Sequence, residues 1–462
     1  MNEKKSRNRA EKGIIYAPWE RALTRVLTPF DEFIHRQTTS GMLLMGTAIV
    51  ALFLANGFLS QAYQHFIHTP TSVRIGGWSL EMSLHHWVND GLMTLFFFVV
   101  GMELKREMMV GELADLRKAA LPIIAAIGGM VMPALIYFAV NSGGEAARGW
   151  GIPMATDIAF AVGTLVLLAG RVPKSLITFL VALAIADDLG AVLVIALFYT
   201  QQLALDWLVV SGGLVLLLFA FNFMGIRRVL PYFLGAVLLW YALLQSGVHA
   251  TLAGVLAAFA VPARSKYDPA LFGERITSLV KRFDSSQQKD GNIMTNESLY
   301  NVAQSLENSA QGVQTPLQRL EHEWHLPVAF LVIPVFALFN AGIPLQFGTL
   351  GETLTHPVML GTMLGLLLGK FIGITGACWL ALRLGIGQLP EGTRFSQIAA
   401  VSVLGGIGFT MSIFIAELAF AGQQQYLLMA KTGVLLASML AGLLGYVWLW
   451  WLGRARQLDD IE

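Results

Sequence analysis

Long apolar runs divide this chain, and they limit its fold more than any other feature. Windows of about 20 apolar residues recur along most of its 462 residues. Only 13% of the residues are charged, whereas a soluble domain has about a quarter. A helix of about 20 apolar residues crosses the hydrocarbon core of a bilayer. The chain is therefore predicted to be an all-α, polytopic membrane protein.

Twelve of these windows are predicted to be transmembrane helices, of which the fourth and the eighth are short. Their ranges are 41–61, 85–109, 119–141, 154–170, 175–200, 204–223, 229–246, 248–262, 326–343, 357–383, 396–420 and 425–452. The predicted organisation is an N-terminal segment (1–40), helices one to eight (41–261), a loop (262–323), helices nine to twelve (324–452) and a tail (453–462).

The charges of the loops indicate how the chain is oriented. An even number of spans places both termini on one side, which carries nearly all of the loop Lys and Arg, whereas the opposite loops hold only Arg74 and Arg148. The positive-inside rule then predicts that both termini and the 262–323 loop are cytoplasmic. This loop is rich in Gln, Asn and Ser, so we expect it to be partly disordered, with one short helix near Glu297–Leu306. On the outer side, residues 72–82 alternate in polarity around two glycines, as in a β-hairpin.

Two adjacent carboxylates, Asp187 and Asp188, lie near the middle of the fifth span. Each costs roughly 2.5–3.5 kcal/mol at the centre of a membrane helix, which indicates a function. Adjacent helical residues point about 100° apart, so one can line a cavity while the other faces a neighbouring helix. Hard cations prefer oxygen ligands, and close carboxylates titrate as one coupled unit. A site that holds either protons or a small cation exchanges one for the other, which is proton-coupled cation antiport.

Lys370 is the candidate partner for one of these carboxylates, because it lies in the middle of the tenth span. It is either a structural counter-ion or a charge that pairs and unpairs during transport. In the same span, Gly361, Gly365, Gly369 and Gly373 recur every four residues. Such a stripe of small residues allows another helix to approach closely.

The fourth span is predicted to be interrupted. Gly149, Gly151 and Pro153 make a regular helix unfavourable just before Thr156 and Asp157. A helix would then begin inside the membrane, which is tolerated where the backbone is buried or lines a cavity. The alternative is an ordinary N-cap at the outer end of a short span, since Thr and Asp are good caps.

The eleventh span is predicted to be interrupted as well, at Gly405, Gly406 and Gly408. Spans four and eleven are seven apart and therefore cross the membrane in opposite directions. Spans three to five and ten to twelve are thus predicted to be inverted repeats, in which paired interruptions mark the binding site. Asp157 and Lys370 would compensate the partial charges of the opposed helix ends.

Seven stretches resemble the bacterial NhaA family of Na⁺/H⁺ antiporters, and the match runs in order from about span one to span twelve. They are "FFFVVGMELKRE", "PMATDIAFAVG", "ALAIADDLGAVLVIALFYT", "LLQSGVHATLAGVLA", "RLEHEWHLPVAFLVIPVFALFNAGI", "LLLGKFIGI" and "GGIGFTMSIFIA". The resemblance implies twelve helices in the bacterial inner membrane, with spans four and eleven crossed and partly unwound. It also implies exchange of cytoplasmic Na⁺ or Li⁺ for external protons, two inward per cation, activated at alkaline pH.

The resemblance also implies roles for individual residues. By motif position, Asp188 is the main ligand of the transported cation, and Asp187 is its partner, which pairs with Lys370 when no cation is bound. Thr156 contributes an oxygen, and Asp157 compensates helix dipoles.

Supporting positions implied by the resemblance are Asp90 in the second span and the three glycines of the eleventh. The candidates for pH response are Glu103, Glu107, His249, Glu321, His322 and His325. The alternatives are a solvated, ion-paired helix end for the glutamates and a buried core residue for His249. The 72–82 hairpin resembles the dimer contact of the family, so the expected partners are a second copy, the bilayer, protons and Na⁺ or Li⁺. We expect no cofactor, no nucleic acid and no enzymatic activity.

Other functions remain alternatives at this point. A transporter of the same fold could carry another ion or an organic anion, although an anion site would need an uncompensated basic group. An intramembrane aspartyl protease needs two carboxylates that face each other from different helices. Asp187 and Asp188 share one helix, so only Asp157 with Asp188 would suit that chemistry. An ion channel is a further alternative.

Overall fold

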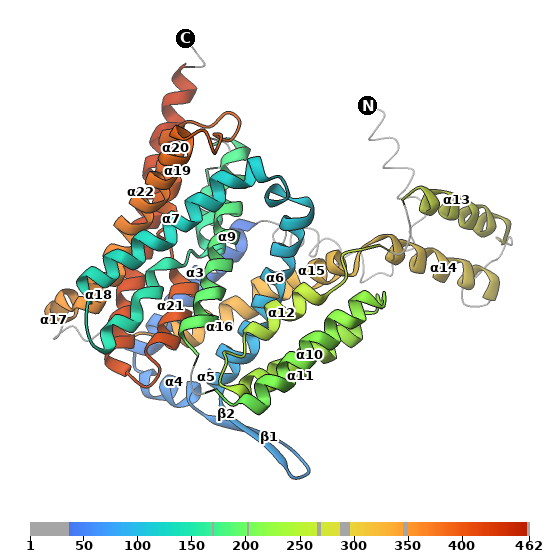
Figure 1. The fold of residues 1–462 in the computed structure, drawn as a ribbon, viewed down its shortest axis with the longest axis horizontal. Helices are drawn as coiled ribbons and strands as arrows, with labels where there is room; N and C mark the ends of the chain where they lie inside the picture. Colours follow the sequence, from blue (N-terminus) through green and yellow to red (C-terminus); the bar gives the residue numbers. More distant parts are fainter. Residues whose placement is uncertain are drawn as a thin grey trace.

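The computed structural model describes residues 37–168, 171–200, 203–265, 269–286, 296–344 and 350–459. Within these ranges, ten helices are long and apolar enough to cross a membrane, and a bent pair of helices forms an eleventh span. The helices pack side by side into one body (Figure 1). The prediction of an all-helical, polytopic membrane protein is confirmed. The predicted N-terminal segment lies outside the described residues except for 37–40, which begin the first helix.

The first six spans are formed by long or composite helices. They are α3 (Gln37–Asn56), α5–η2–α6 (Leu84–His86, Trp87–Leu92 and Met93–Val110), α7 (Leu116–Val140), η4–α8 (Glu145–Met154 and Ile158–Val166), α9 (Lys174–Phe198) and α10 (Leu205–Phe223). The predicted range of the fourth span, 154–170, was wrong at its start, because the span begins at Glu145 with a 3₁₀ helix. Glycines and charges in that segment hide it from a search for apolar windows.

The remaining predicted spans also coincide with helices. They are α11 (Val229–Ser246), α12 (Leu252–Ala260), α15–η5–α16 (Pro316–Pro327, Val328–Val332 and Ile333–Asn340), α18–η7–α19 (Pro357–Leu364, Gly365–Gly369 and Lys370–Arg383), α20–α21 (Phe395–Leu404 and Phe409–Ala419) and α22 (Gln424–Asp459). α12 has only 9 residues, so it is too short to cross the bilayer by itself.

A β-hairpin forms at one end of the body, as the alternating pattern predicted. Strands β1 (Pro70–Ile75) and β2 (Trp78–Ser83) pair antiparallel, and Gly76 in the turn has a φ of 62°. This left-handed conformation favours glycine. The hairpin lies at the opposite end from the C-terminus (Figure 1). We call the two ends of the body the hairpin face and the tail face.

Contacts between span ends show that consecutive spans alternate in direction. On the hairpin face, the Asn141 side chain after α7 donates to the Pro357 carbonyl at the start of α18 (3.0 Å). On the tail face, the Ser175 hydroxyl in α9 donates to the Glu391 carbonyl before α20 (2.6 Å). Span three therefore runs antiparallel to span ten, and span five runs parallel to span eleven. These are the directions that inverted repeats require.

The spans form two groups. The core bundle contains α7, η4–α8, α9, α18–η7–α19, α20–α21 and α22, and the flanking bundle contains α3, α5–η2–α6, α10, α11, α12 and α15–η5–α16. Within the core bundle α7 packs on α19 and α18 on α22, whereas in the flanking bundle α6 packs on α12 and α3 on α16. The two bundles meet where α3 contacts α8 and α16 contacts α21.

The long polar loop contains more helix than we expected. Helix α13 (Pro269–Ser286) and helix α14 (Glu297–Val313) contact each other, and the expected short helix is the first part of α14. Leu279 and Leu299 are buried, because apolar residues spaced three and four apart give α13 one apolar face. The residues between the two helices, 287–295, lie outside the described ranges.

The glycine stripe of the tenth span faces α7, as a close helix contact requires. Gly369 lies against Pro133 and Gly373 against the backbone of Gly128, whereas Gly365 lies against Pro153 of η4 and the Pro133 carbonyl. A Cβ atom at any of these positions would overlap the neighbouring helix. The stripe therefore sets the distance between α7 and the helix that carries Lys370.

We predict that Gly373→Val destabilises the protein by about 1–3 kcal/mol, because overpacking forces the two backbones apart. Gly376→Val is the matched control, since a Cβ there has nothing within 4 Å. Thermal unfolding in detergent measures the difference. Equal midpoints for the two variants would contradict the close contact.

Candidate functional site

Two broken spans cross in the middle of the core bundle. One break is the extended segment 155–157 between η4 and α8, and the other is Gly405–Gly408, where α20 and α21 bend by 49°. The Asp157 N–H donates to the Ile407 carbonyl (2.7 Å), and the Thr156 hydroxyl donates to the Gly405 carbonyl (2.9 Å). These bonds satisfy backbone groups that water cannot reach at this depth.

Glycine is needed at the second break because other backbones approach it closely. A Cβ on Gly406 would lie 2.5 Å from the Leu366 carbonyl oxygen, and one on Gly408 would lie 3.0 Å from the Ala155 carbonyl oxygen. The predicted interruption thus follows from weak helix propensity together with lack of space.

Asp157 connects the starts of two helices. Its Oδ1 accepts from the Phe160 N–H (3.0 Å) at the start of α8, and its Oδ2 accepts from the N–H (3.0 Å) and the hydroxyl (2.5 Å) of Thr410 at the start of α21. One buried carboxylate therefore faces the positive ends of two helix dipoles. Asp157 is thus an N-cap, but it lies at a break inside the bundle and not at the outer end of a short span, because the fourth span begins at Glu145.

Asp187 and Lys370 form a buried ion pair. The Lys370 ammonium donates to Asp187 Oδ2 at 2.6 Å, and both side chains are almost fully buried. Thr156 also faces the Asp187 carboxyl. Among the described residues, the hydrogen bond of Lys370 goes to Asp187 and not to a carbonyl at a helix end. Lys370 thus has a direct charge partner, and its compensation of charges at the helix ends stays a prediction.

A π-helical turn, η7, ends immediately before Lys370. The extra residue of such a turn changes the face on which the following side chains lie, and π-helical turns are frequent at functional sites. Asp90 lies in another π-helical turn, η2. Neither turn has a clear signal in the sequence.

Asp188, the next residue along α9, takes no part in this ion pair. Its side chain is 1% exposed, and neither of its carboxylate oxygens has a hydrogen-bond partner in the described part of the chain. The second oxygen of Asp187 is likewise unpartnered there. Asp188 lies within electrostatic range of Asp157 and Lys370. Buried polar atoms are normally paired, so these three oxygens are suited to bind a hard cation or protons.

A cavity of 480 Å³ opens the tail face beside α9. It is lined by Glu107 and Val110 from the second span, Asp115 and Lys118 near the third, and α9 residues up to Ala182. Asp187 comes five positions after Ala182, which is about 7.5 Å along a helix. The tail face therefore gives access toward the carboxylates between the second and fifth spans.

Aromatic side chains pack together on the side of the site that faces the hairpin face. Phe414, one turn after Thr410 in α21, is fully buried. Its ring centroid lies 5.6 Å from that of Phe97, 6.1 Å from that of Phe336 and 5.4 Å from that of His249. This aromatic barrier joins the core bundle to the flanking bundle between the site and the hairpin face.

Three of the candidates for pH response meet around Arg106 near the tail face. The Arg106 guanidinium lies 4.0 Å from Glu103, 3.2 Å from Glu107 and 3.1 Å from Glu321. The sequence placed Arg106 near the first two glutamates only, because Glu321 comes from a distant helix. This Arg106 cluster links α6 to α15.

The three candidate histidines form no ion pair with Arg106 or its glutamates in the described part of the chain, although His325 lies within electrostatic range of Glu321 and Arg106. His322 and His325 are exposed on α15. His249 lies in the aromatic barrier, where its Nε2 is 3.7 Å from Asp90 Oδ1 and its Nδ1 is 2.7 Å from the Thr251 hydroxyl. These contacts suit a core histidine with satisfied polar atoms.

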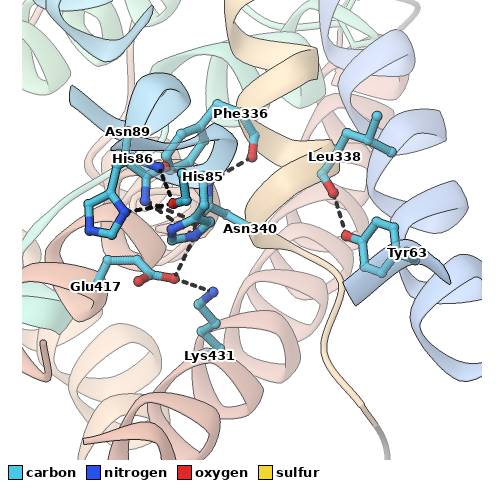
Figure 2. Close-up of polar contacts among 10 residues, drawn as sticks. Tyr63, His85, His86, Asn89, Phe336, Leu338, Asn340, Glu417 and Lys431 are labelled. Atoms are coloured by element: carbon cyan, nitrogen blue, oxygen red, sulfur yellow. Dashed lines mark hydrogen bonds and ion pairs between the residues drawn. The ribbon is translucent and has the colours of Figure 1, made fainter. Parts of the chain in front are cut away.

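Sequence reasoning missed two parts of the polar interior. Thr410 follows the glycines of the second break in the sequence, and nothing there indicates that it bonds Asp157. At the hairpin face, Glu417 contacts Lys431 and His85 (Figure 2). An ionisable residue inside an apolar run was the available signal for Glu417, but nothing in the sequence indicated its partners.

The chain is similar to known proteins over nearly its full length. The model of the family Na⁺/H⁺ antiporter 1 matches residues 31–449. The chain is 56% identical over 435 residues to Na⁺/H⁺ antiporter NhaA 1 of Saccharophagus degradans, covering 94% of each chain. It is 50% identical over 441 residues to Na⁺/H⁺ antiporter NhaA of Sulfurimonas denitrificans, covering 96% of this chain and 99% of the relative. It is also 50% identical over 463 residues to the NhaA of Syntrophobacter fumaroxidans, covering 99% and 96%.

We predict that Thr410→Val destabilises the protein by about 1.5–3 kcal/mol, because it removes a hydrogen bond to a buried carboxylate while keeping the shape of the side chain. Thr362→Val is the control, since that buried hydroxyl bonds the Val358 carbonyl of its own helix and no other group in the described part of the chain. Loss of this bond should cost about 0.5–1.5 kcal/mol. Thermal unfolding in detergent compares the two. Equal losses would show that Asp157 does not depend on Thr410.

Proposed function

This chain belongs to the NhaA family of Na⁺/H⁺ antiporters, and we propose that the crossing of its two broken spans is where it exchanges cytoplasmic Na⁺ or Li⁺ for external protons. Na⁺/H⁺ antiport itself follows from the family. The residues that carry it, the stoichiometry, the pH dependence and the sidedness are our proposals.

The observation that carries the proposal is the unpartnered, buried Asp188 carboxylate beside the Asp187–Lys370 ion pair. Asp188 is the main cation ligand, with Asp187 and the Thr156 hydroxyl as further oxygen donors. Protons occupy the same carboxylates when the cation leaves, since a buried carboxylate without a cation is costly to keep charged. Cation and protons thus exclude each other at one site.

Lys370 strengthens the competition between the cation and the protons. A cation bound between Asp187 and Asp188 would lie close to the Lys370 ammonium, and like charges at such distances repel strongly in a poorly screened interior. Binding of the cation would therefore weaken the Asp187–Lys370 pair, and departure of the cation would restore it. The expected repulsion supports the interpretation of Lys370 as a charge that pairs and unpairs during transport, and not the interpretation as a merely structural counter-ion.

Asp157 is the scaffold of the site. Both of its oxygens bond helix N-termini, so it holds the crossing together and lies close enough to Asp188 to influence a bound cation. The same bonds argue against an aspartyl protease formed by Asp157 and Asp188, because neither oxygen of Asp157 is free to share a proton across a dyad.

The remaining assignments concern the membrane. The basic loops place the tail face in the cytoplasm of the bacterial inner membrane, so the cavity beside α9 admits the cytoplasmic cation. The Arg106 cluster borders that cavity through Glu107, which suits a role in activation at alkaline pH. The β1–β2 hairpin is the proposed contact of a homodimer. Two protons enter for each cation that leaves, so the exchange is electrogenic.

Transport in proteoliposomes tests the proposal. Na⁺ should collapse an imposed ΔpH, K⁺ should not, and the rate should rise toward alkaline pH. An imposed membrane potential should change the rate, because a net charge moves in each cycle. A rate independent of the potential would contradict the two-proton stoichiometry.

We predict that Asp188→Asn reduces exchange to the level of empty vesicles, because an amide can neither hold the proton nor supply the charge that binds the cation. Asp206→Asn is the control, since Asp206 is an exposed acid on α10. Na⁺-dependent collapse of ΔpH is measured for both at equal protein density. Full exchange by Asp188→Asn would place the cation site elsewhere.

A further inference from the structure

A second polar cluster lies at the hairpin face, away from the carboxylates of the crossing. Glu417, near the end of α21, bonds the Lys431 ammonium of α22 at 2.5 Å. The two side chains are only 13% and 12% exposed. Both helices belong to the core bundle, so this pair fixes the Glu417 carboxylate within that bundle.

The same carboxylate also contacts the flanking bundle. Its Oε1 lies 3.5 Å from Nε2 of His85, at the start of the second span (Figure 2). His85 Nε2 is also 3.1 Å from Oδ1 of Asn340, at the end of the ninth span. Both oxygens are acceptors, so the tautomer with its proton on Nε2 donates toward them.

Two asparagines hold His85 in place. Asn340 donates to Asn89 Oδ1 (2.8 Å) and to the Phe336 carbonyl (3.0 Å), and both asparagines are buried. Asn89 lies one turn after His85, with its amide 3.4 Å from the ring. The flanking bundle therefore presents His85 to the core bundle from a rigid support.

The two faces of the protein differ where the bundles meet. On the tail face, a cavity separates the second span from α9. On the hairpin face, Glu417 and His85 connect α21 to the second span, directly beyond the aromatic barrier of Phe414. An exchanger must close the tail face and open the hairpin face in every cycle, because the site must lose access to one side when it opens to the other.

We propose that Glu417, positioned by Lys431, forms a latch with His85 that holds the hairpin face closed, and that the latch must open for each exchange of ions with that side. The inference goes beyond the ion site, because it uses the antiport activity and none of the assignments at Asp188. Glu417 and His85 act as positioning residues, since they touch neither the cation nor the carboxylates that bind it.

Crosslinking tests the latch directly. His85→Cys with Glu417→Cys is built on a Cys378→Ala background, which removes the one native cysteine. A short thiol-specific crosslinker should stop Na⁺/H⁺ exchange in proteoliposomes, and cleavage of the crosslink should restore it. Glu417→Cys with Lys431→Cys is the matched control, because a crosslink within the core bundle should leave exchange at its value before crosslinking.

The comparison is made within each variant, so a changed starting rate does not affect it. Full exchange after quantitative crosslinking of positions 85 and 417 would overturn the proposal, and so would equal arrest of the control pair. Failure of the assignments at Asp188 would leave this result unchanged.

Glu417→Gln provides a second test that does not need crosslinking. Loss of a contact made only while the hairpin face is closed shifts the population toward the other state. The apparent KM for Na⁺ should rise about three- to tenfold on the tail face and fall on the hairpin face, and Glu417→Asp should restore both values. A shift in the same direction on both faces, as a general structural defect would give, would overturn the latch.

Discussion

The crossing of two broken helices, held by the Asp157 carboxylate, is the constraint on which the rest of the structure depends. Interrupted backbone is tolerated at membrane depth only where its polar groups are satisfied by protein or line a cavity. Asp157 satisfies the starts of α8 and α21 together, and Thr156 and Asp157 bond the backbone of the other break. The glycines at 406 and 408 allow this approach. The same arrangement places Thr156 beside the Asp187 carboxyl.

The chemistry then follows from the different surroundings of two neighbouring carboxylates. Asp187 is bonded to Lys370, whereas Asp188 has two unpartnered oxygens in the described part of the chain. A helix places adjacent side chains about 100° apart, so one turn of α9 carries both a charge pair and an open oxygen site. The cavity on the tail face opens toward this site, whereas the proposed latch on the hairpin face holds the protein closed on that side. The ion site and the gate are thus separate parts of one exchanger.

Much of this could be predicted from the sequence, because the bilayer imposes simple rules. Apolar windows located the spans, alternating polarity located the hairpin, and glycines and Pro153 located the breaks. The cost of burying charge pointed to Asp187, Asp188 and Lys370. The start of the fourth span at Glu145 was missed because a 3₁₀ helix with Gly149 and Arg148 has no long apolar run. The partners of Glu417 and Asp157 were missed because hydropathy does not specify which side chains of distant helices meet, and the π-helical turn before Lys370 has no local signature.

The central claim is that cation and protons compete for the same buried carboxylates. Its most direct test is proton release on addition of Na⁺ to the purified protein in weakly buffered detergent solution, with choline as the control ion. Because a cation ligand must lose its proton before it binds, the account predicts release that saturates with Na⁺ near two protons per bound cation. Saturable Na⁺ binding without proton release would contradict it.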